Sequence, residues 1–468
     1  MKKLSEIIEC KYDVNIFGVA DDSRNVKEGY LFVATKGYYV DHYDFMDDAI
    51  NNGAVAIVAD RKPSKNINIP IILVEDVNKH YVDICSKFYN VKPSEFKFIG
   101  ITGTDGKTTT ATIVCEILKQ EKLCAYIGTN GVQIGDDYYP TTNTTPCVEE
   151  LFRCLRYVKE HNCKLIVMEV SSEALLHERL NGFKYDIVAF TNITEDHLNV
   201  HKTIENYRSC KFKLLELLND NGKVVINGDD NNCRMIEASN LHSVGFNDDN
   251  QFIIKNVKEM SKNVKFDLWI NDKCYNITSP LKGKYNVYNV AMAFVICLLS
   301  NLDYNEIVFN ISKLHVIKGR RECLDFGQDF DIILDYAHTY NGIKCLLESV
   351  SDYKKIITVT GAAGGREIEK RGKIGKLVLE KSTIAIFTMD DPRYESVDEI
   401  IDQMVCLSDK KYLRIINRKD AIFKAFELAD KESVVLIIGK GRDNYMAIED
   451  RREPYSDYEN IEKYFKIK

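Results

Sequence analysis

The sequence predicts an α/β protein of three domains, each built on a sheet flanked by helices. Three observations predict this class. The chain has 468 residues, which is too long for one ordinary domain. Short apolar runs alternate with runs of helical spacing along most of the chain. The alternation starts again near residue 330, where a third unit of Rossmann-like order begins. We place the domains at residues 1–94, 95–325 and 326–468.

The N-terminal unit is expected to be a small α/β domain. Its apolar runs predict strands at residues 31–34, 54–58 and 71–74. Helical spacing predicts helices at residues 45–52 and 77–89. The segment 91–94 contains a proline and is typical of a linker to the next domain.

The central domain is expected to contain a mostly parallel sheet. A strand at residues 96–101 leads into a glycine-rich turn and then into a helical run, Ala111 to Gln120. Further strands are predicted at residues 124–128, 165–170, 187–191 and 223–227. Residues 244–276 indicate a small antiparallel insertion, and residues 286–299 an apolar helix.

The third domain repeats the alternation of strands and helices. Strands are predicted at residues 331–335, 355–360, 384–388 and 434–439. Helices are predicted at residues 343–351, 374–380, 396–407 and 420–428. This order favours a Rossmann-like domain.

Composition excludes several classes of function. The net charge of −7 and the lack of a basic block with aromatic residues argue against a nucleic-acid partner. The apolar run at residues 290–299 is about half of what spans a bilayer, so no membrane partner is expected. Fourteen scattered cysteines without a C-x-x-C pair favour free thiols in a reducing compartment. The charged N-terminus does not match an export signal, so we expect a cytoplasmic protein.

A phosphate-binding loop is predicted between the first central strand and its helix. Backbone N–H groups near the glycines can approach a polyphosphate, and the helix adds the positive end of its dipole. Lys107 would neutralise phosphate charge, and the Thr108 hydroxyl would face Mg²⁺. The loop residues are Gly103, Thr104, Asp105, Gly106, Lys107, Thr108 and Thr109.

Two further strand ends carry polar side chains. Glu169 ends a buried strand, where carboxylates that bind Mg²⁺ are found beside a phosphate loop. The alternative is that this segment only caps a helix through Ser171 or Ser172. Asp196 and His197 follow the next strand, and His197 is a candidate metal ligand, although such pairs are more often structural.

The motifs together resemble the Mur ligase family and, within it, the MurE type, which adds the third residue of the peptidoglycan stem peptide. The resemblance covers essentially the whole chain in unbroken order. It rests on the phosphate loop and on residues 143–146, 169–172, 191–197 and 335–339.

This resemblance implies an ATP-dependent ligase that joins a diamino acid to UDP-MurNAc-L-Ala-D-Glu through an acyl phosphate. The site must supply cations and alignment, because crowded anions react there. The implied catalytic residues are Lys107, Glu169, His197 and Lys211, and the implied Mg²⁺ ligands are Thr108, Glu169, His197 and Lys211 as its carbamate. The alternatives are a folylpolyglutamate or cyanophycin-type ligase, and a nucleotide-binding regulatory or scaffold protein without catalysis.

The resemblance also assigns binding residues. Ser23 would contact the uridine pyrophosphate in the N-terminal domain. We expect the protein to be a monomer. The MurNAc-dipeptide would be bound by Asn143, Thr144, Thr145, Ser171, His177 and Arg179. ATP would contact Asn286, Asn289, Arg320 and Asp335. If these residues meet, the third domain must close onto the central domain.

The third domain would choose the amino acid. The implied residues are Arg371, Asp390, Asp391, Pro392, Arg393, Gly439 and Asp443. Arg393 suits the distal carboxylate of meso-diaminopimelate, which we favour. Asp391 stands where the family has asparagine, and its charge could instead attract the ammonium group of lysine or ornithine. Other departures from the family pattern are Asp105, Glu173, Tyr340 and Arg442.

Overall fold

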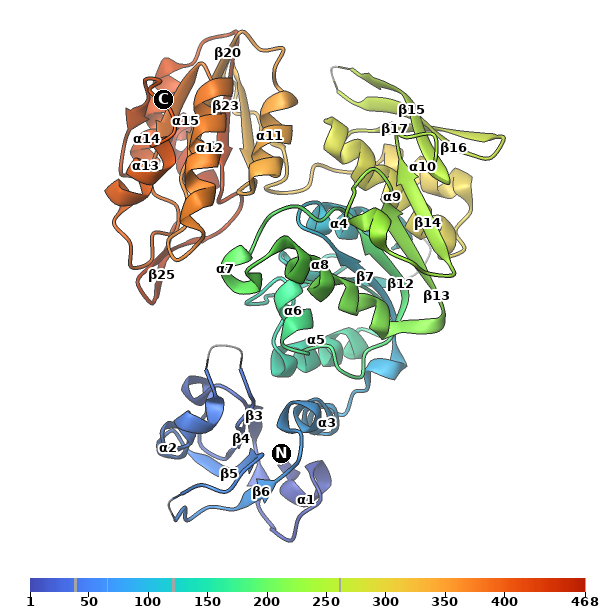
Figure 1. The fold of residues 1–468 in the computed structure, drawn as a ribbon, viewed down its shortest axis with the longest axis vertical. Coiled ribbons are helices and arrows are strands. Elements are labelled where there is room, and N and C mark those ends of the chain that lie inside the picture. Colours follow the sequence, from blue (N-terminus) through green and yellow to red (C-terminus); the bar gives the residue numbers. More distant parts are fainter. Residues whose placement is uncertain (38–39, 65, 120–122, 261, 468) are drawn as a thin grey trace.

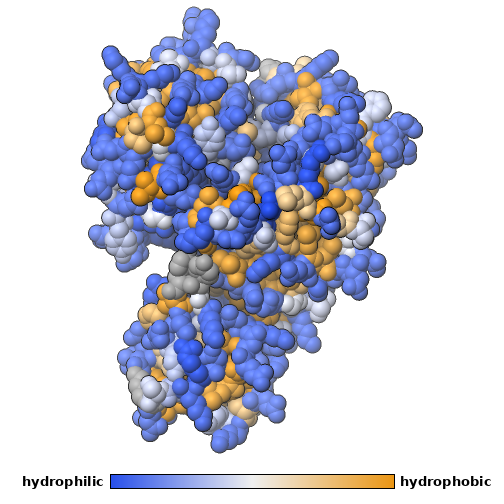
Figure 2. All heavy atoms as spheres, in the orientation of Figure 1, coloured by the Kyte–Doolittle hydropathy of each residue, from blue (hydrophilic) through white to orange (hydrophobic). Residues whose placement is uncertain are grey.

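The computed structural model describes residues 1–37, 40–64, 66–119, 123–260 and 262–467 (Figure 1). The N-terminal domain lies at one end of the longest axis, and the central and third domains lie side by side toward the other end. Figure 2 shows a hollow on one side of the molecule, between the N-terminal domain and the two larger domains. The mixed α/β class with a mostly parallel central sheet confirms the fold prediction.

The N-terminal domain has a parallel sheet of four strands in the order β3-β4-β5-β6. The predicted strands and helices of this domain are all present. Asp76 caps the start of α3, and Asn90 ends it in the left-handed conformation that asparagine tolerates. The elements are β1 (Lys2–Lys3), α1 (Leu4–Ile7), β2 (Asn15–Ile16), β3 (Gly18–Ala20), β4 (Tyr30–Val33), α2 (Met46–Asn51), β5 (Ala54–Ala59), β6 (Ile71–Leu73) and α3 (Val77–Tyr89).

The central sheet has 11 strands, and its middle part is parallel. Its order is β10 (Asp137–Tyr139), β9 (Gly131–Ile134), β8 (Cys124–Gly128), β11 (Leu165–Glu169), β7 (Lys97–Thr102), β12 (Tyr185–Phe190), β13 (Leu218–Asn227), β14 (Leu241–Gly245), β15 (Phe252–Glu259), β16 (Val264–Ile270) and β17 (Lys273–Ser279). The expected antiparallel insertion is therefore not separate. β14 pairs in parallel with β13, and β15 pairs in parallel with β14. Within the described part of this segment, antiparallel pairing is limited to β16 with its neighbours β15 and β17.

Helices cover both faces of this sheet, as a buried parallel sheet requires. α4 and α9 pack on one face, and α5 packs on the other. Gln120, the last residue of the predicted first helix, lies outside the described residues. The helices are α4 (Lys107–Leu118), α5 (Val148–Glu160), α6 (Ser172–Leu176), α7 (Leu198–His201), α8 (Ile204–Phe212), α9 (Lys284–Leu299) and α10 (Tyr304–Ser312).

The third domain has a sheet of six strands, of which five are parallel and the edge strand β18 is antiparallel. Its order is β18 (Glu322–Leu324), β19 (Asp331–Asp335), β23 (Ser433–Ile438), β20 (Lys355–Thr360), β21 (Ile384–Phe387) and β22 (Leu413–Arg414). The remaining elements are α11 (Tyr340–Glu348), α12 (Ile368–Lys381), α13 (Val397–Val405), α14 (Arg418–Leu428), the hairpin β24 (Tyr445–Ile448) and β25 (Arg451–Pro454), and α15 (Asp457–Ile467).

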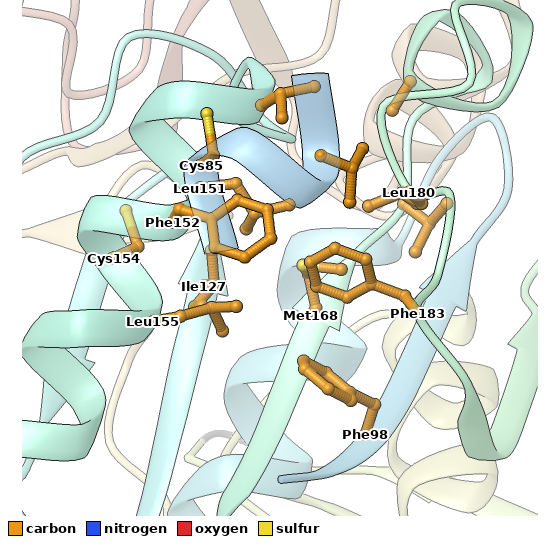
Figure 3. Packing of buried hydrophobic residues seen from close by; sticks show 14 of the residues in the cluster. Cys85, Phe98, Ile127, Leu151, Phe152, Cys154, Leu155, Met168, Leu180 and Phe183 are labelled. Carbon is orange, nitrogen blue, oxygen red and sulfur yellow. The ribbon is translucent and has the colours of Figure 1, made fainter. Parts of the chain in front are cut away.

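The apolar interior is continuous between the first two domains. Figure 3 shows Cys85 of α3 beside Leu151 and Phe152 of α5, above Met168 and Phe183 of the central domain. All fourteen cysteines lie within the described residues as free thiols, as predicted. Among the described helices, none is both long and apolar enough to cross a bilayer.

Candidate active site

The phosphate loop lies between β7 and α4 at the carboxyl edge of the central sheet. Gly103 has a φ of 150°, and a Cβ there would lie 1.9 Å from Thr191 Oγ1, so only glycine fits. The Lys107 amine donates to the carbonyl oxygens of Gly103 (3.0 Å) and Thr104 (2.9 Å). Burial lowers the pKa of Lys107, although Glu169 and Asp105 oppose that shift. The loop therefore holds its lysine folded over the place where phosphates would bind.

Glu169 ends β11, the strand next to β7, and its carboxylate is fully buried. One oxygen, Oε2, accepts a hydrogen bond from Thr108 Oγ1 at 2.8 Å. The other, Oε1, accepts from the Thr129 N–H at 3.0 Å and from the Tyr126 hydroxyl. The two residues predicted to share a metal ion are thus in direct contact.

His197 follows β12 on the other side of β7 and has a left-handed backbone, with a φ of 55°. Its buried Nδ1 has no hydrogen-bond partner among the described residues. Burial lowers the pKa of His197 to about 3, against the opposing charge of Asp196. The imidazole is therefore neutral near pH 7, as a metal ligand must be.

Lys211 lies on α8 and is almost fully buried. Its Nζ is 2.8 Å from the Gly103 carbonyl oxygen and 4.5 Å from the centre of the Tyr207 ring. Burial, with the nearby charge of Lys107 as the next cause, places the pKa of Lys211 well below its ordinary value. The side chain is thus an amine that is easily deprotonated, pointed at the phosphate loop.

The predicted nucleotide contacts surround the same loop. A Cβ on Gly106 would lie 2.6 Å from Asn289 Oδ1, so α9 begins against the loop. Asn289 donates to Asn286 Oδ1 at 3.2 Å. Arg320, from the segment that enters the third domain, donates to Thr108 Oγ1 at 2.9 Å.

Asp335 ends β19 and faces the same segment of chain. Its carboxylate accepts the N–H groups of Arg321 and Ala337, both at 2.6 Å. Burial raises the pKa of Asp335, and the charge of Arg320 opposes the shift. These contacts hold the Asp335 carboxylate, which is predicted to contact the ribose, in place at the entrance to the third domain.

Most residues predicted to bind the MurNAc-dipeptide lie beside Glu169. Thr145 Oγ1 donates to the Glu169 carbonyl oxygen at 2.8 Å and accepts the Ser171 N–H at 2.9 Å. Arg179 donates to the Thr145 carbonyl oxygen at 3.2 Å. Three further predicted residues have different surroundings. Thr144 Oγ1 lies 3.0 Å from Thr129 Oγ1, and Asn143 is exposed. His177 is half-buried, and burial lowers its pKa.

Ser23 lies in the N-terminal domain as the first residue of a short 3-10 turn. It is buried, and its carbonyl oxygen accepts a hydrogen bond from Asn52 at 2.8 Å. This turn follows β3, so Ser23 is placed at a strand end as in the other domains.

Asp391, which replaces the usual asparagine, is paired with a cation in the third domain. Its Oδ1 accepts from Lys440 Nζ at 2.7 Å and from the Ala447 N–H at 2.8 Å. Burial would lower the pKa of Lys440, but Asp390, Asp443 and Asp391 outweigh it and raise that pKa. Lys440 therefore stays charged and neutralises the added carboxylate.

Two arginines predicted to bind the amino acid have different surroundings. Arg371 is buried, and its guanidinium is paired with Glu395 at 2.6 Å and donates to the Ala363 carbonyl oxygen at 2.8 Å. Arg393 instead lines a cavity of about 390 Å³ together with Gly365, Tyr394, Glu395, Glu449 and Asp450. Arg371 thus orders the loop around Glu395, whereas Arg393 reaches open space.

The other residues predicted to bind the amino acid lie around Lys440, Asp390 and Glu395. Asp443 Oδ2 is 3.3 Å from Lys440 Nζ, and a Cβ on Gly439 would lie 2.1 Å from Asp390 Oδ2. Pro392 is buried, and its carbonyl oxygen accepts the Glu395 N–H.

The departures from the family pattern have identifiable contacts. Arg442 pairs with Glu322 through both Nε (2.8 Å) and Nη2, and it stacks 3.4 Å from the centre of the Tyr458 ring. Asp105 accepts the Thr339 hydroxyl with both oxygens at 3.0 Å. Tyr340 begins α11 and is exposed, and Glu173 lies 3.8 Å from His197 Nδ1.

Polar contacts close the third domain onto the central one. Lys370 on α12 pairs with Asp196 at 2.7 Å, and Glu367 accepts the Leu198 N–H. With the Asp105 contact to Thr339, they place the third domain over the phosphate loop.

Several residues at the site were not predicted from sequence. They are Tyr126, Thr129, Thr339, Glu395 and Lys440. Two of them had a signal: Lys440 is the cation within the glycine-rich segment 439–443, and Thr339 ends the family-like segment 335–339. In the described ranges no three His, Cys, Asp or Glu side chains gather to hold a metal ion, so the predicted set depends on Thr108 and Lys211 as well.

A phosphate loop flanked by a buried carboxylate, with a third domain closed over it, defines a nucleotide-dependent α/β enzyme. Family models identify which one: the Mur ligase middle domain matches residues 101–297, the Mur ligase glutamate ligase domain residues 319–441, and the Mur ligase family catalytic domain residues 15–92. The chain belongs to the Mur ligase family, and it is an ATP-dependent ligase.

Curated relatives agree over the full length. A protein of Caldanaerobacter subterraneus subsp. tengcongensis named UDP-N-acetylmuramoyl-L-alanyl-D-glutamate--2,6-diaminopimelate ligase is 34% identical, over 99% of this chain and 97% of its own. A Bacillus cereus protein of the same name is 35% identical, over 98% of this chain and 97% of its own. A solved structure of a ligase with this name is 25% identical, with a TM-score of 0.66, and covers 100% of this chain and 99% of its own.

Proposed function

We propose that this enzyme joins meso-diaminopimelate to the D-glutamate side-chain carboxylate of UDP-MurNAc-L-Ala-D-Glu in the cytoplasm, as a monomer. The observation that carries the proposal is the convergence of Lys107, Glu169 and Lys211 on one loop under the closed third domain. His197 lies close enough to both lysines for their charges to help lower its pKa. The name shared by its full-length relatives supports the same substrates.

The reaction has two steps. A carboxylate oxygen of the dipeptide attacks the γ-phosphorus of ATP, the bond to the β,γ-bridging oxygen breaks, and ADP leaves. The amine of the incoming amino acid then attacks the acyl carbon, loses a proton and expels phosphate. Phosphate therefore carries away one oxygen of the original carboxylate. Both steps bring anions together, so fixed cations and alignment supply most of the catalysis.

The chain's own residues support these steps as follows. Lys107 and the loop N–H groups would bind the phosphates at the start of α4. Asn286 and Asn289 would contact the adenine, and Arg320 and Asp335 the phosphates and ribose. These side chains lie around one loop, which is consistent with a common ligand.

Mg²⁺ fits the donors at the loop. Thr108 and Glu169 offer hard oxygen atoms 2.8 Å apart, and the unpaired Nδ1 of neutral His197 is suited to ligation. By the family pattern, Thr108 and Glu169 would hold one Mg²⁺ ion, His197 would help to hold a second, and carbamylated Lys211 would lie between the two. Bound there, Mg²⁺ supplies positive charge that offsets the charge on the transferred phosphoryl group.

Lys211 is suited to carbamylation. Only a neutral amine attacks CO₂, and burial keeps the Lys211 pKa low. The product would turn a buried cation into a carboxylate-like metal ligand. Lys107 is also close to the Gly103 carbonyl oxygen, but it lies on the loop itself and is better placed to bind phosphate.

The ion pair between Asp391 and Lys440 favours diaminopimelate over lysine or ornithine. Because Lys440 neutralises Asp391, the substitution leaves no free negative charge to attract a distal ammonium group. Arg393, in its cavity, is available for the distal carboxylate that lysine and ornithine lack. Asp390, Pro392, Gly439 and Asp443 complete the amino-acid site, and Arg371 supports it through Glu395.

The remaining assignments follow the same family pattern. Ser23 would contact the uridine pyrophosphate, and Asn143, Thr144, Thr145, Ser171, His177 and Arg179 the MurNAc-dipeptide. We keep domain limits at residues 1–94, 95–325 and 326–468 as part of the proposal.

The test measures phosphate release with UDP-MurNAc-L-Ala-D-Glu and, in turn, meso-diaminopimelate, L-lysine and L-ornithine. We expect turnover with diaminopimelate, and ¹⁸O placed in the D-glutamate carboxylate should appear in the released phosphate. Faster turnover with lysine would refute the role of Arg393. No turnover with any of the three would refute the ligase proposal.

A second variant tests the carbamate. Lys211→Ala should lose activity, and a short carboxylic acid in the buffer should restore part of it. Full activity of the untreated variant would refute carbamylation.

A further inference from the structure

Tyr126 is a buried phenol at the edge of the site that the proposed mechanism does not use. It lies on β8, the strand next to β11, and its backbone pairs with Val167 in the parallel register. Its side chain is 1% exposed and packs with the apolar face covered by α4 and α9. Its hydroxyl donates to Glu169 Oε1. One ring therefore joins the apolar core to the buried carboxylate.

The chain leaves room for this contact at Gly128, the last residue of β8. A Cβ on Gly128 would lie 2.3 Å from Glu169 Oε1 and 2.4 Å from the Tyr126 hydroxyl oxygen. Any larger residue would push into the hydrogen bond itself. The glycine, the phenol and the carboxylate thus form one fitted group.

The two oxygens of Glu169 have different closest partners, although the Thr129 hydroxyl also reaches Oε2, at 3.5 Å. Oε1 faces β8 and accepts from Tyr126 and from the Thr129 N–H at 3.0 Å. Oε2 faces the phosphate loop and accepts from Thr108 Oγ1 at 2.8 Å. Two donors on the first oxygen fix the rotation of the carboxylate, which directs the second oxygen to the loop.

We propose that Tyr126 is a positioning residue for the metal carboxylate, holding Glu169 so that Oε2 faces Thr108 and a divalent cation at the phosphate loop. The proposal rests on the assignment of Glu169 as a Mg²⁺ ligand. Tyr126 does not touch substrate; it acts through Glu169. Hydrogen bonds to a metal-binding side chain commonly contribute 10- to 100-fold to metal affinity.

The test compares Tyr126→Phe with Tyr185→Phe. Tyr126→Phe keeps the ring and removes only the hydroxyl. Tyr185 is equally buried, on β12 of the same sheet, and its hydroxyl has no hydrogen-bond partner within the described part of the chain. The second variant therefore measures the effect of losing a buried tyrosine hydroxyl without the contact to Glu169.

The readout is ADP binding by calorimetry, with and without Mg²⁺. We expect Tyr126→Phe to raise the Mg²⁺ concentration needed for tight ADP binding by about tenfold, while ADP binding without Mg²⁺ stays unchanged. Tyr185→Phe should match the unaltered enzyme in both measurements. Gly128→Ala should show the same Mg²⁺-dependent loss as Tyr126→Phe, by displacing the hydrogen bond sterically.

Three outcomes overturn the inference: an unchanged Mg²⁺ dependence in Tyr126→Phe, an equal loss of ADP binding with and without Mg²⁺, or the same Mg²⁺ effect in Tyr185→Phe. The readout needs no amino-acid substrate. A failure of the ligase proposal would appear in the phosphate assay and leave this measurement unaffected.

Discussion

The central domain meets its two neighbours through surfaces of opposite character. Toward the N-terminal domain, the contact is one apolar cluster with residues from both domains, from Leu4 in the first to Ile236 in the second. Within this cluster α3 packs on α5 (Figure 3). Toward the third domain, the contacts are polar: Lys370 with Asp196, and Thr339 with Asp105. The third domain has apolar clusters of its own, built only from residues 324–461.

From this difference we infer that the apolar interface with the N-terminal domain is fixed and that the polar interface with the third domain can open. Opening the first interface would expose apolar area at about 25 cal/mol per Å², whereas polar groups in the second can exchange partners with water. The ATP side of the reaction needs substrate to enter and product to leave. We therefore expect motion between the central and third domains, about the segment at Gly319 to Arg321, where both named residues have positive φ.

The largest expected effect comes from the apolar interface. Leu151→Ala removes a fully buried side chain of α5 and should lower the free energy of unfolding by about 2–5 kcal/mol. Urea unfolding followed by hydrogen exchange should show the N-terminal and central domains losing protection together. Leu346→Ala, in the core of the third domain, is the matched control and should weaken that domain alone. Separate loss of the N-terminal domain in Leu151→Ala would contradict a shared core.

A smaller effect is expected at the polar interface. Lys370→Ala leaves Asp196, whose side chain is 9% exposed, without its lysine partner, so the third domain should open. Small-angle scattering should report a larger radius of gyration, and the KM for the amino acid should rise severalfold.

Lys373→Ala is the control for that experiment. Its contact with Glu195 is 3.5 Å long, and the two side chains are 57% and 64% exposed, so its loss should change little. An unchanged radius in Lys370→Ala would show that other contacts keep the domains closed.

The smallest effect concerns pH at the apolar interface. Burial raises the pKa of Glu149, which accepts the Tyr89 hydroxyl, against the opposing effects of Tyr89 and Arg153. A raised native pKa means that the stabilisation is complete below about pH 4.5 and is lost as the pH rises through the native value. Glu149→Gln should flatten this slope in urea unfolding measured from pH 4 to 8. Glu160→Gln, exposed on the same helix, should keep the slope.

The sequence predicted best what depends on one strand and the helix after it. The phosphate loop, Glu169 and His197 each follow a buried strand, and parallel strands bring their ends to one edge. Contacts that need the register of two strands, such as Tyr126 with Glu169, had no local signal. Contacts that need the orientation of two domains, such as Asp105 with Thr339, had none either. The hairpin of β24 and β25 was missed because each strand has only 4 residues and β25 consists of charged residues and a proline.

The continuous core of the first two domains limits how this chain can exchange parts with its relatives. A crossover near residue 318 would pass on a complete third domain, with Arg393, Lys440 and their cavity, and would cut no apolar cluster. A crossover near residue 92 would separate α3 from α5 and split one core between two parents. If the proposed sites are right, chimeras made at the first point should inherit amino-acid choice as a module, whereas the proposed sugar-binding and phosphate-transferring parts should have to be inherited together.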